Sequence, residues 1–325
     1  MAEVTVKPLE TDIRAAAKKK IGARRSKLKM VMPLFIMMAP GLIYLLINNY
    51  LPMFGLAIAF KDINYAKGIL GSDWVGFKNF EYLFSTKDAF VITRNTIFYN
   101  VVFIFLNTVI AIAVAIMLNE IKNKLMKSFY QSVVLLPFLI SMVIVAYLGV
   151  AFLSVDVGIL NKTILPLLGL DEISWYSEAK HWPFILVLIN LWKGLGFLCV
   201  IYLAAIIGID KEYYEAATLD GASKLQQIKY ITIPSIMPVI IMLTLLSIGK
   251  IFYSDFGLFY QVPMNSGALY DTTSVIDTYV YRGLMQLGDI GMSAAAGLYQ
   301  SIVGFILVLL SNYLVRRKSK DNALF

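Results

Sequence analysis

The 325-residue chain has little of the side-chain chemistry that enzymes and metal sites use. It contains one cysteine, Cys199, and one histidine, His181, so an intrachain disulfide and a Cys/His metal cluster are both excluded. It has no G-x-x-x-x-G-K-S/T sequence, the loop that cradles nucleotide phosphates. It also shows no paired carboxylates and no nucleophile–base set. The sequence therefore predicts a protein that is not an enzyme and that binds no cofactor or metal of its own.

Charged residues are scarce, at 15%, whereas 59% of the residues are hydrophobic. Soluble domains are about 45–50% apolar. The excess falls in runs of roughly 18 or more residues, the length that a helix needs to cross about 30 Å of hydrocarbon, and barrel strands would be shorter and would alternate. The predicted fold class is an all-α polytopic membrane protein. Its six transmembrane helices are expected at residues 31–59, 97–118, 130–153, 183–207, 235–252 and 294–315.

Lysine and arginine are distributed unequally between the two sides of these spans, and short cytoplasmic loops hold the excess. Nineteen fall on one side, in the arm 1–30, the loops 119–129 and 208–234, and the C-terminal residues 316–320. Eight fall on the other side, in the longer loops 60–96, 154–182 and 253–293. We therefore expect a multi-pass protein of the cell membrane with both termini in the cytoplasm.

The same distribution divides the chain into a basic cytoplasmic arm (1–30), a six-span domain (31–318) and a cytoplasmic tail (319–325). Nine of the positive charges lie in the arm, beside the membrane surface. The net charge of +8 is therefore assigned to contact with acidic lipid headgroups and not to nucleic acid.

The long loops on the other side are rich in aromatic residues, glycine and aspartate. In the first of them, Phe77, Phe80, Leu83 and Phe84 recur at helical spacing, which predicts an amphipathic helix at the membrane interface. Two interpretations stay open for these aromatic residues. They belong either to an ordinary interfacial belt or to a docking surface for an external partner.

A polar stretch between the fourth and fifth spans, residues 208–234, is longer than a simple connection requires. Residues 211–219 are predicted to form a two-turn helix, which ends at Asp220-Gly221 because glycine readily adopts positive φ. A second short helix is expected over 222–231, and Pro234 marks the entry to the fifth span. Small residues beside an acidic one make a compact knob that suits a groove on a soluble protein. The alternative is a structured loop that only joins two spans.

Within this stretch, "EAATLDGASKLQQIKYITIPSIMP" resembles the EAA motif of the permease subunits of binding-protein-dependent ABC importers. The matching residues are Glu215, Ala216, Ala217, Asp220, Gly221, Ala222, Ile231 and Pro234, with Ile233 where the family more often has leucine. Upstream, Asn190, Trp192 and Gly196 fall in the frame of the carbohydrate branch, which is of the type I, maltose-transporter-like kind. "YLPMFGLAIAFKDINYAKGILGSDWVGFKNF" is similar to its complex-polysaccharide and oligosaccharide (lipoprotein-linked) permeases. The resemblance covers about residues 30–318.

The resemblance implies that the knob is a coupling helix which inserts into a cytoplasmic ATPase. The residues implied to couple are Glu215, Ala216, Ala217, Asp220, Gly221 and Ala222. It also implies a second homologous permease, in a heterodimer, two ATPase subunits that bind ATP and Mg, and an extracytoplasmic solute-binding protein. The implied activity is ATP-driven import of oligosaccharides, with polysaccharide fragments that carry uronic acids among the expected substrates.

Two lysines lie in or near predicted spans, where an ionisable residue is a functional candidate. Lys193 lies well inside the fourth span and Lys250 lies near the end of the fifth. Either they line a hydrated pathway and attract a carboxylated sugar, or they snorkel or pair with Asp255 or a backbone carbonyl. Because sugar rings pack on aromatic faces, the predicted pathway also includes Trp192, Phe197, Tyr147 and Tyr253.

Two other functions remain as alternatives at this point. One is a permease of an ABC importer for another class of solute, because such importers share the coupling loop. The other is an ion-coupled secondary transporter, which often uses intramembrane carboxylates. Asp156, Asp255 and Asp289 lie only near span ends, which argues against the secondary transporter.

Overall fold

The computed structural model describes residues 31–318, apart from the side chains of residues 82–85 and 318. The predicted arm (1–30) and tail (319–325) lie outside the described residues. The chain separates into two compact units, Met1–Ala57 and Ile58–Phe325, which we describe individually. In the described part, helices dominate and the only strands are two of two residues each.

The described part of the first unit is an apolar helix. This helix continues through Ile58 to Phe60, which are the first three residues of the second unit. A regular helix over 31–45 passes through a π-helical turn, η1 (Leu46–Tyr50), into η2 (Leu51–Phe60), a 3-10 helix. The change of winding coincides with Pro52, which lacks a backbone N–H and disfavours a regular helix. The whole segment, Val31–Phe60, is long and apolar enough to cross a membrane, as predicted.

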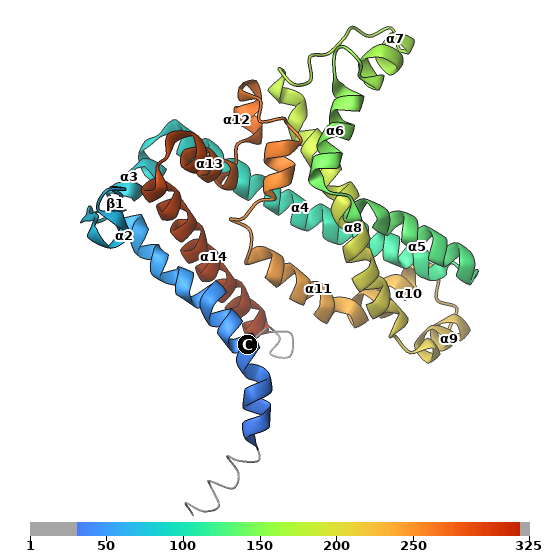
Figure 1. Ribbon diagram of the computed structural model, residues 1–325. Coiled ribbons are helices and arrows are strands. Elements are labelled where there is room, and N and C mark those ends of the chain that lie inside the picture. The colour runs from blue at the N-terminus through green and yellow to red at the C-terminus, as the bar shows by residue number, and fades with distance from the viewer. Residues whose placement is uncertain (1–30, 319–325) are drawn as a thin grey trace, which may run out of the picture. The chain divides into compact units, whose positions relative to one another are not determined.

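The second unit holds the other long helices (Figure 1). They are α4 (Lys87–Glu120), α8 (Trp182–Ile207), the continuous helix of α10 (Lys224–Gln227), η5 (Ile228–Thr232) and α11 (Ile233–Ile248), and α14 (Ile290–Lys318). With the first unit these make five helices able to span a membrane, and six if the bent pair α5 (Lys124–Leu139) and α6 (Met142–Leu153) is one span. The predicted polytopic all-α class is confirmed.

The third predicted span, 130–153, is wrong as a single helix. α5 and α6 meet at an angle of 95°. Pro137 lies inside α5 and removes a backbone donor, and the Ile140 N–H turns back to the Pro137 carbonyl at 3.2 Å. Ser141 then starts α6 by accepting the Ile144 N–H on its hydroxyl, at 3.4 Å. The hydropathy of 130–153 is continuous across the break, so it predicts one span.

Two other predicted spans have different ends in the structure. α4 begins ten residues before the predicted 97, because the Thr86 hydroxyl accepts the Ala89 N–H at 3.2 Å and caps the helix. Its first turns are polar, and their composition predicts a loop instead. The fifth span ends at Ile248 and not at 252, and it already begins at Lys224.

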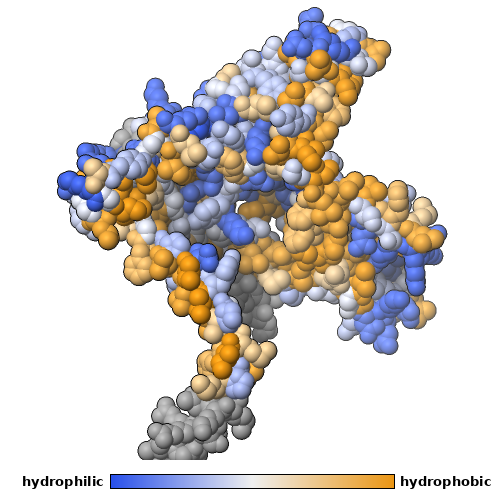
Figure 2. Space-filling model, viewed as in Figure 1, coloured by the Kyte–Doolittle hydropathy of each residue, from blue (hydrophilic) through white to orange (hydrophobic). Residues whose placement is uncertain are grey.

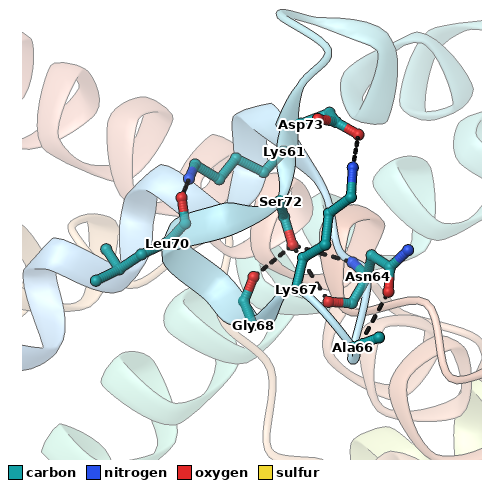
Figure 3. A network of polar contacts seen from close by, with 8 residues as sticks. All are labelled: Lys61, Asn64, Ala66, Lys67, Gly68, Leu70, Ser72 and Asp73. Carbon is teal, nitrogen blue, oxygen red and sulfur yellow. Dashed lines mark hydrogen bonds and ion pairs between the residues drawn. The ribbon is translucent and has the colours of Figure 1, made fainter.

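A small hairpin opens the second unit. β1 (Lys61–Asp62) pairs antiparallel with β2 (Asp73–Trp74), and α2 (Gly68–Gly71) fills the connection. Figure 3 shows how polar contacts hold this connection. The Ser72 hydroxyl donates to the Gly68 carbonyl at 2.6 Å, and Lys67 pairs with Asp73 at 2.9 Å and lowers the pKa of that carboxyl. The Lys61 ammonium, buried, donates to the Leu70 carbonyl at 2.9 Å.

The predicted amphipathic helix of this loop is present as α3 (Lys78–Ser85). Phe80 packs with the apolar cluster around Phe252, whereas Phe77 is exposed. The Asn79 amide donates to the Ala59 carbonyl at 3.0 Å and to the Lys61 carbonyl at 2.9 Å, so it joins α3 to the hairpin.

Short helices occupy the two remaining long connections. Those after α6 are η3 (Leu160–Ile164), α7 (Leu165–Leu167) and η4 (Ala179–His181). Those after α11 are η6 (Gly257–Gln261), η7 (Gly267–Leu269), α12 (Tyr270–Thr273), α13 (Ile276–Arg282) and η8 (Gly283–Leu287).

α8 forms the centre of the packing in the second unit. Tyr202, Leu203 and Cys199 are buried in one cluster with α4 and α11, and Trp182 is buried in another with Phe259. Cys199 is therefore a packing residue, as expected of a small apolar side chain. Gly196 lets α8 touch the backbone of α5, and close approach at small residues is how membrane helices gain packing energy.

Substitution of Gly196 tests this contact. In Gly196→Ala, the new Cβ would clash with the Val134 carbonyl oxygen and lie 2.7 Å from the Leu135 Cα, both backbone atoms. We expect a loss of about 1–3 kcal/mol in stability from overpacking, measured as a lower melting temperature of the purified protein in detergent. Gly297→Ala in α14 is the control, because its Cβ meets nothing within 4 Å. Equal melting temperatures for the two variants would contradict the close contact.

Candidate functional site

The polar stretch between α8 and α11 begins with α9 (Lys211–Leu219), at the bounds that the sequence predicts. The Asp210 carboxylate caps its start by accepting the Glu212 N–H at 3.1 Å. Its end is a paired C-terminal motif in which the Ala222 N–H donates to the Ala217 carbonyl at 2.9 Å and the Gly221 N–H to the Thr218 carbonyl at 3.1 Å. Gly221 has φ +78°, which explains the glycine at this position.

One face of α9 is bonded to the start of the helix that leads into α11. The Tyr214 hydroxyl lies 2.9 Å from the Thr232 hydroxyl, and the buried Gln227 amide donates to the Thr218 hydroxyl at 3.0 Å. Lys224 forms an ion pair with Glu120, at the end of α4, at 3.1 Å. These bonds fix α9 to the first turns of the helix that leads into α11, and the ion pair ties that helix to the end of α4.

The opposite face of α9 is exposed. Glu212, Glu215, Ala216 and Leu219 follow one another at helical spacing on this face, and the Leu219 side chain is 89% exposed. Figure 2 shows hydrophilic surface over α9 beside the apolar band of the long helices. Of the other predicted coupling residues, Asp220 and Gly221 are exposed, and Ala217 and Ala222 are half-buried.

The predicted second short helix, 222–231, does not end at residue 231 in the structure. Ser223 and Gln226 form a capping box that starts α10, and the helix then continues without a break through η5 into α11. The π-helical turn of η5 comes directly before Pro234, where the proline ring and missing N–H disturb regular winding. α9 is therefore joined to a 25-residue helix, Lys224–Ile248.

A polar cavity of about 240 Å³ lies between α4, α8 and α11. Polar side chains line much of it: Asn100, Asn107, Thr108, Asn190, Ser247, Lys250, Tyr253 and Asp255. The Asn107 amide donates to the Asn190 amide oxygen at 2.7 Å. α11 starts beside α9, so Lys250 and Tyr253 lie at the end of the cavity that is remote from α9.

The chain around Lys250 and Tyr253 is irregular, and polar side chains from other helices hold it. The Asn100 amide donates to the Ile251 carbonyl at 2.9 Å, and the Gln300 amide donates to the Phe252 carbonyl at 2.7 Å. The Asp277 carboxylate accepts the Ser254 N–H at 2.7 Å. Burial raises the pKa of Asp277, whereas this hydrogen bond opposes the rise.

The structure does not bring the six predicted pathway residues together. Among the described residues, the lining of the cavity includes Lys250 and Tyr253 but not Lys193 or Trp192. The Lys193 ammonium instead donates to the carbonyls of Pro137, at 3.3 Å, and Ile140. Of the alternatives left open for Lys193, pairing with backbone carbonyls is therefore the one observed.

The aromatic candidates are also dispersed. Phe197 stacks on Phe138 with ring centroids 5.1 Å apart, and Trp192 is partly exposed. Tyr147 lines a separate hollow. His181 pairs with Glu178 at 3.4 Å outside this cavity.

Sequence reasoning missed most of the polar cavity lining. Asn100 and Asn107 are seven residues apart in an apolar run, which places them on one face of a helix, and Ser247 and Lys250 are three apart. That spacing of polar residues inside predicted spans was the available signal.

Known proteins are similar to this chain in both sequence and fold. The sequence pattern of the family described as "Binding-protein-dependent transport system inner membrane component" matches residues 107–320, two thirds of the chain. The chain is a member of this family. It is therefore a multi-pass membrane permease of a transport system, and its family consists of transport subunits and not of enzymes.

Two Bacillus subtilis proteins are among the similar relatives. The permease is 34% identical to the polygalacturonan/rhamnogalacturonan transport system permease protein YteP, over 93% of this chain and 94% of that one. It is 35% identical to Protein LplB, over 89% and 90% of the two chains.

A solved structure agrees with the sequence relatives. A chain of a bacterial ABC transporter involved in the import of the acidic polysaccharide alginate superposes with a TM-score of 0.84 at 33% identity, and covers 91% of the permease and 99% of that chain. The type I importer fold expected from the EAA motif is confirmed. Family membership also decides between an ABC importer and a secondary transporter in favour of the importer.

The position of Lys193 in the permease predicts a structural effect. Lys193→Met removes this donor from both carbonyls. The Pro137 carbonyl keeps the Ile140 N–H, whereas the Ile140 carbonyl loses the side-chain donor that it has in the structure, and an unsatisfied backbone group costs about 1–3 kcal/mol. We expect a lower melting temperature in detergent, with Lys250→Met unchanged as the control, because the Lys250 side chain is exposed. A Lys193→Met protein as stable as the parent would show that the two carbonyls do not need the ammonium.

Proposed function

We propose that the permease forms half of the translocation pathway of an ATP-driven importer of acidic oligosaccharides, and that α9 couples it to a cytoplasmic ATPase. Two similar proteins give the strongest support for this substrate class, at 33–34% identity over more than 90% of the chain. One is YteP, which is named for polygalacturonan and rhamnogalacturonan, and the other belongs to a transporter involved in the import of alginate. All three polymers contain uronic acids.

The polar cavity between α4, α8 and α11 has side chains that suit such a substrate. Carboxamide and hydroxyl groups of Asn107, Asn190 and Ser247 suit sugar hydroxyls, and the exposed Lys250 ammonium suits a carboxylate. Tyr253 supplies an aromatic face and is held by a 2.8 Å hydrogen bond between its hydroxyl and that of Ser301. A neutral sugar would use the amides and leave the ammonium unpaired.

The coupling proposal rests on the shape and attachment of α9. Its exposed face carries two carboxylates, an alanine and a leucine, which together suit a groove with both polar and apolar contacts. Its other face is bonded to α11 through Tyr214 and Thr232. A force applied to the exposed face is therefore delivered to the helix that borders the cavity.

We further propose the partners and the orientation. The permease pairs with a second homologous permease, two ATPase subunits that hold ATP and Mg, and an extracytoplasmic solute-binding protein, and both its termini and α9 face the cytoplasm. A structure similar to this chain, with a TM-score of 0.82, is described as an alginate ABC transporter in complex with an alginate pentasaccharide-bound periplasmic protein. That complex supports a solute-binding protein as partner.

Two substitutions test the coupling role. Glu215→Ala removes an exposed carboxylate, and Gly221→Ala puts a side chain at φ +78°, at a cost of about 1–2 kcal/mol. We expect each to lower substrate-stimulated ATP hydrolysis of the reconstituted importer at least tenfold while the protein stays inserted.

Matched controls lie on the segment after α6. Glu172 is an exposed glutamate, and Gly169 has φ +68° and open space around it, so that an added Cβ would meet no atom within 4 Å. Glu172→Ala and Gly169→Ala should therefore keep full ATP hydrolysis. If stimulated hydrolysis survives in both α9 variants, α9 is not the coupling element.

The role of Lys250 is tested by the charge of the substrate. Lys250→Met should lower uptake of an oligogalacturonide by about ten- to a hundredfold, since a hydrogen bond to a charged group contributes about 1.5–3 kcal/mol. Uptake of a neutral oligosaccharide of equal length should change little, and Lys250→Arg should retain acidic uptake. Equal losses for both substrates would remove the carboxylate contact.

A further inference from the structure

A second hollow lies outside the polar cavity, between the start of α6 on one side and the end of η6 with the residues that follow it on the other. Its volume is about 450 Å³, within the range of roughly 300–1,000 Å³ that small-molecule sites occupy. On the α6 side it is lined by Val143, Ala146 and Tyr147, which is 67% exposed. The other side is lined by Tyr260, Gln261, Met264 and Asn265. None of the functions assigned above uses these residues as a group.

The rim of the hollow is held in a strained conformation. Met264 has φ 53°, a value that residues other than glycine and asparagine rarely adopt, and Asn265 follows it in the same region at 47°. The Asn265 amide oxygen accepts from the Arg282 guanidinium at 3.1 Å and from the Tyr270 hydroxyl at 3.2 Å. The guanidinium stacks on the Tyr270 ring at 4.1 Å. Such strain persists where the surroundings over-determine it, and it gathers at binding sites.

These bonds also orient the Asn265 side chain. With the amide oxygen occupied by two donors, the amide nitrogen is the group left to donate to a ligand. The described part of the chain provides this nitrogen with no hydrogen-bond acceptor. The strain at the rim therefore presents a fixed donor.

The aromatic side of the hollow, at Tyr260, is also held in place by its neighbours. Tyr260 stacks on Phe256 at 4.8 Å, and the Tyr281 ring meets Tyr260 edge-on at 5.1 Å. Gly257 lets this turn lie against α6, because a Cβ there would be 2.7 Å from the Met142 side chain. The wall thus needs no rearrangement to accept a ligand.

The lining favours a sugar over an apolar ligand. Two tyrosine rings offer faces for a pyranose, and two carboxamides offer hydrogen bonds to hydroxyls. The lining residues carry no formal charge, so the hollow recognises the sugar ring and not a carboxylate.

We propose that this hollow is a second saccharide subsite, which rests on the proposed import of oligosaccharides. η6 joins the hollow and the polar cavity along the chain, since Asp255 lines the polar cavity while Tyr260 and Gln261 line the hollow. In this proposal an oligosaccharide long enough to pass around the packed Leu258 and Phe259 contacts both, and a disaccharide held beside Lys250 contacts only the polar cavity. The hollow selects for chain length.

The test compares uptake of oligogalacturonides of two and six units by the reconstituted importer with its solute-binding protein. Tyr147→Ala and Tyr260→Ala should each lower the kcat/KM of uptake for the hexamer about three- to tenfold and leave the dimer unchanged. Tyr65→Ala is the control, because Tyr65 is similarly exposed, at 76%, and lies in the hairpin connection. Equal losses for dimer and hexamer, or no loss for either, would overturn the subsite.

A second measurement does not depend on transport. A photoreactive phenylalanine analogue in place of Tyr147 should crosslink to a labelled hexamer, and excess unlabelled hexamer should abolish the product. Crosslinking to the second permease or to lipid, with no sugar product, would show that these cover the hollow and would overturn the subsite. If the parent protein imports neither oligogalacturonide while the sugar crosslink forms, the import proposal fails and the subsite stands.

Discussion

In hydrocarbon, each backbone carbonyl and N–H must find its partner within the protein, and the break between α5 and α6 leaves carbonyl groups without their helical partners. Pro137 interrupts the helix there, and the chain turns by 95°. The Lys193 ammonium, carried on the neighbouring α8, donates to the two carbonyls at the break. One turn further on, Gly196 allows the backbones of α8 and α5 to touch. The direction of α6, and with it the hollow beside Tyr147, depends on this junction.

The same solution recurs at the irregular chain that follows α11. Amide side chains from other helices take over the task of the missing helical bonds: Asn100 binds the Ile251 carbonyl, Gln300 that of Phe252, and Asn95 that of Ser274. Each of these residues lies in a long apolar helix. Polar residues in the spans of this permease therefore support irregular backbone as well as line the cavity, and Asn100 does both.

The sequence predicts best the features that depend on local chemistry. The ends of α9 follow from Asp210 and Gly221, a cap and a positive φ, and hydropathy finds the long helices because burial in lipid depends on composition. It misses the bend after Pro137, because hydropathy carries no information on angle. It also leaves the role of Lys193 open between pathway and pairing, because its partners lie 56 and 53 residues away in the sequence and are set by helix packing. Most of the cavity lining was missed for the same reason, since it comes from three helices.

The helix from Lys224 to Ile248 is uninterrupted, so a tilt at one end displaces the other end. Its 25 residues extend over about 37 Å at 1.5 Å per residue, so a tilt of about 5° displaces one end by roughly 3 Å relative to the other. That distance is comparable to the length of a hydrogen bond. In the coupling proposed for α9, such a tilt would make or break a contact at the far end of this helix without any change in its internal structure.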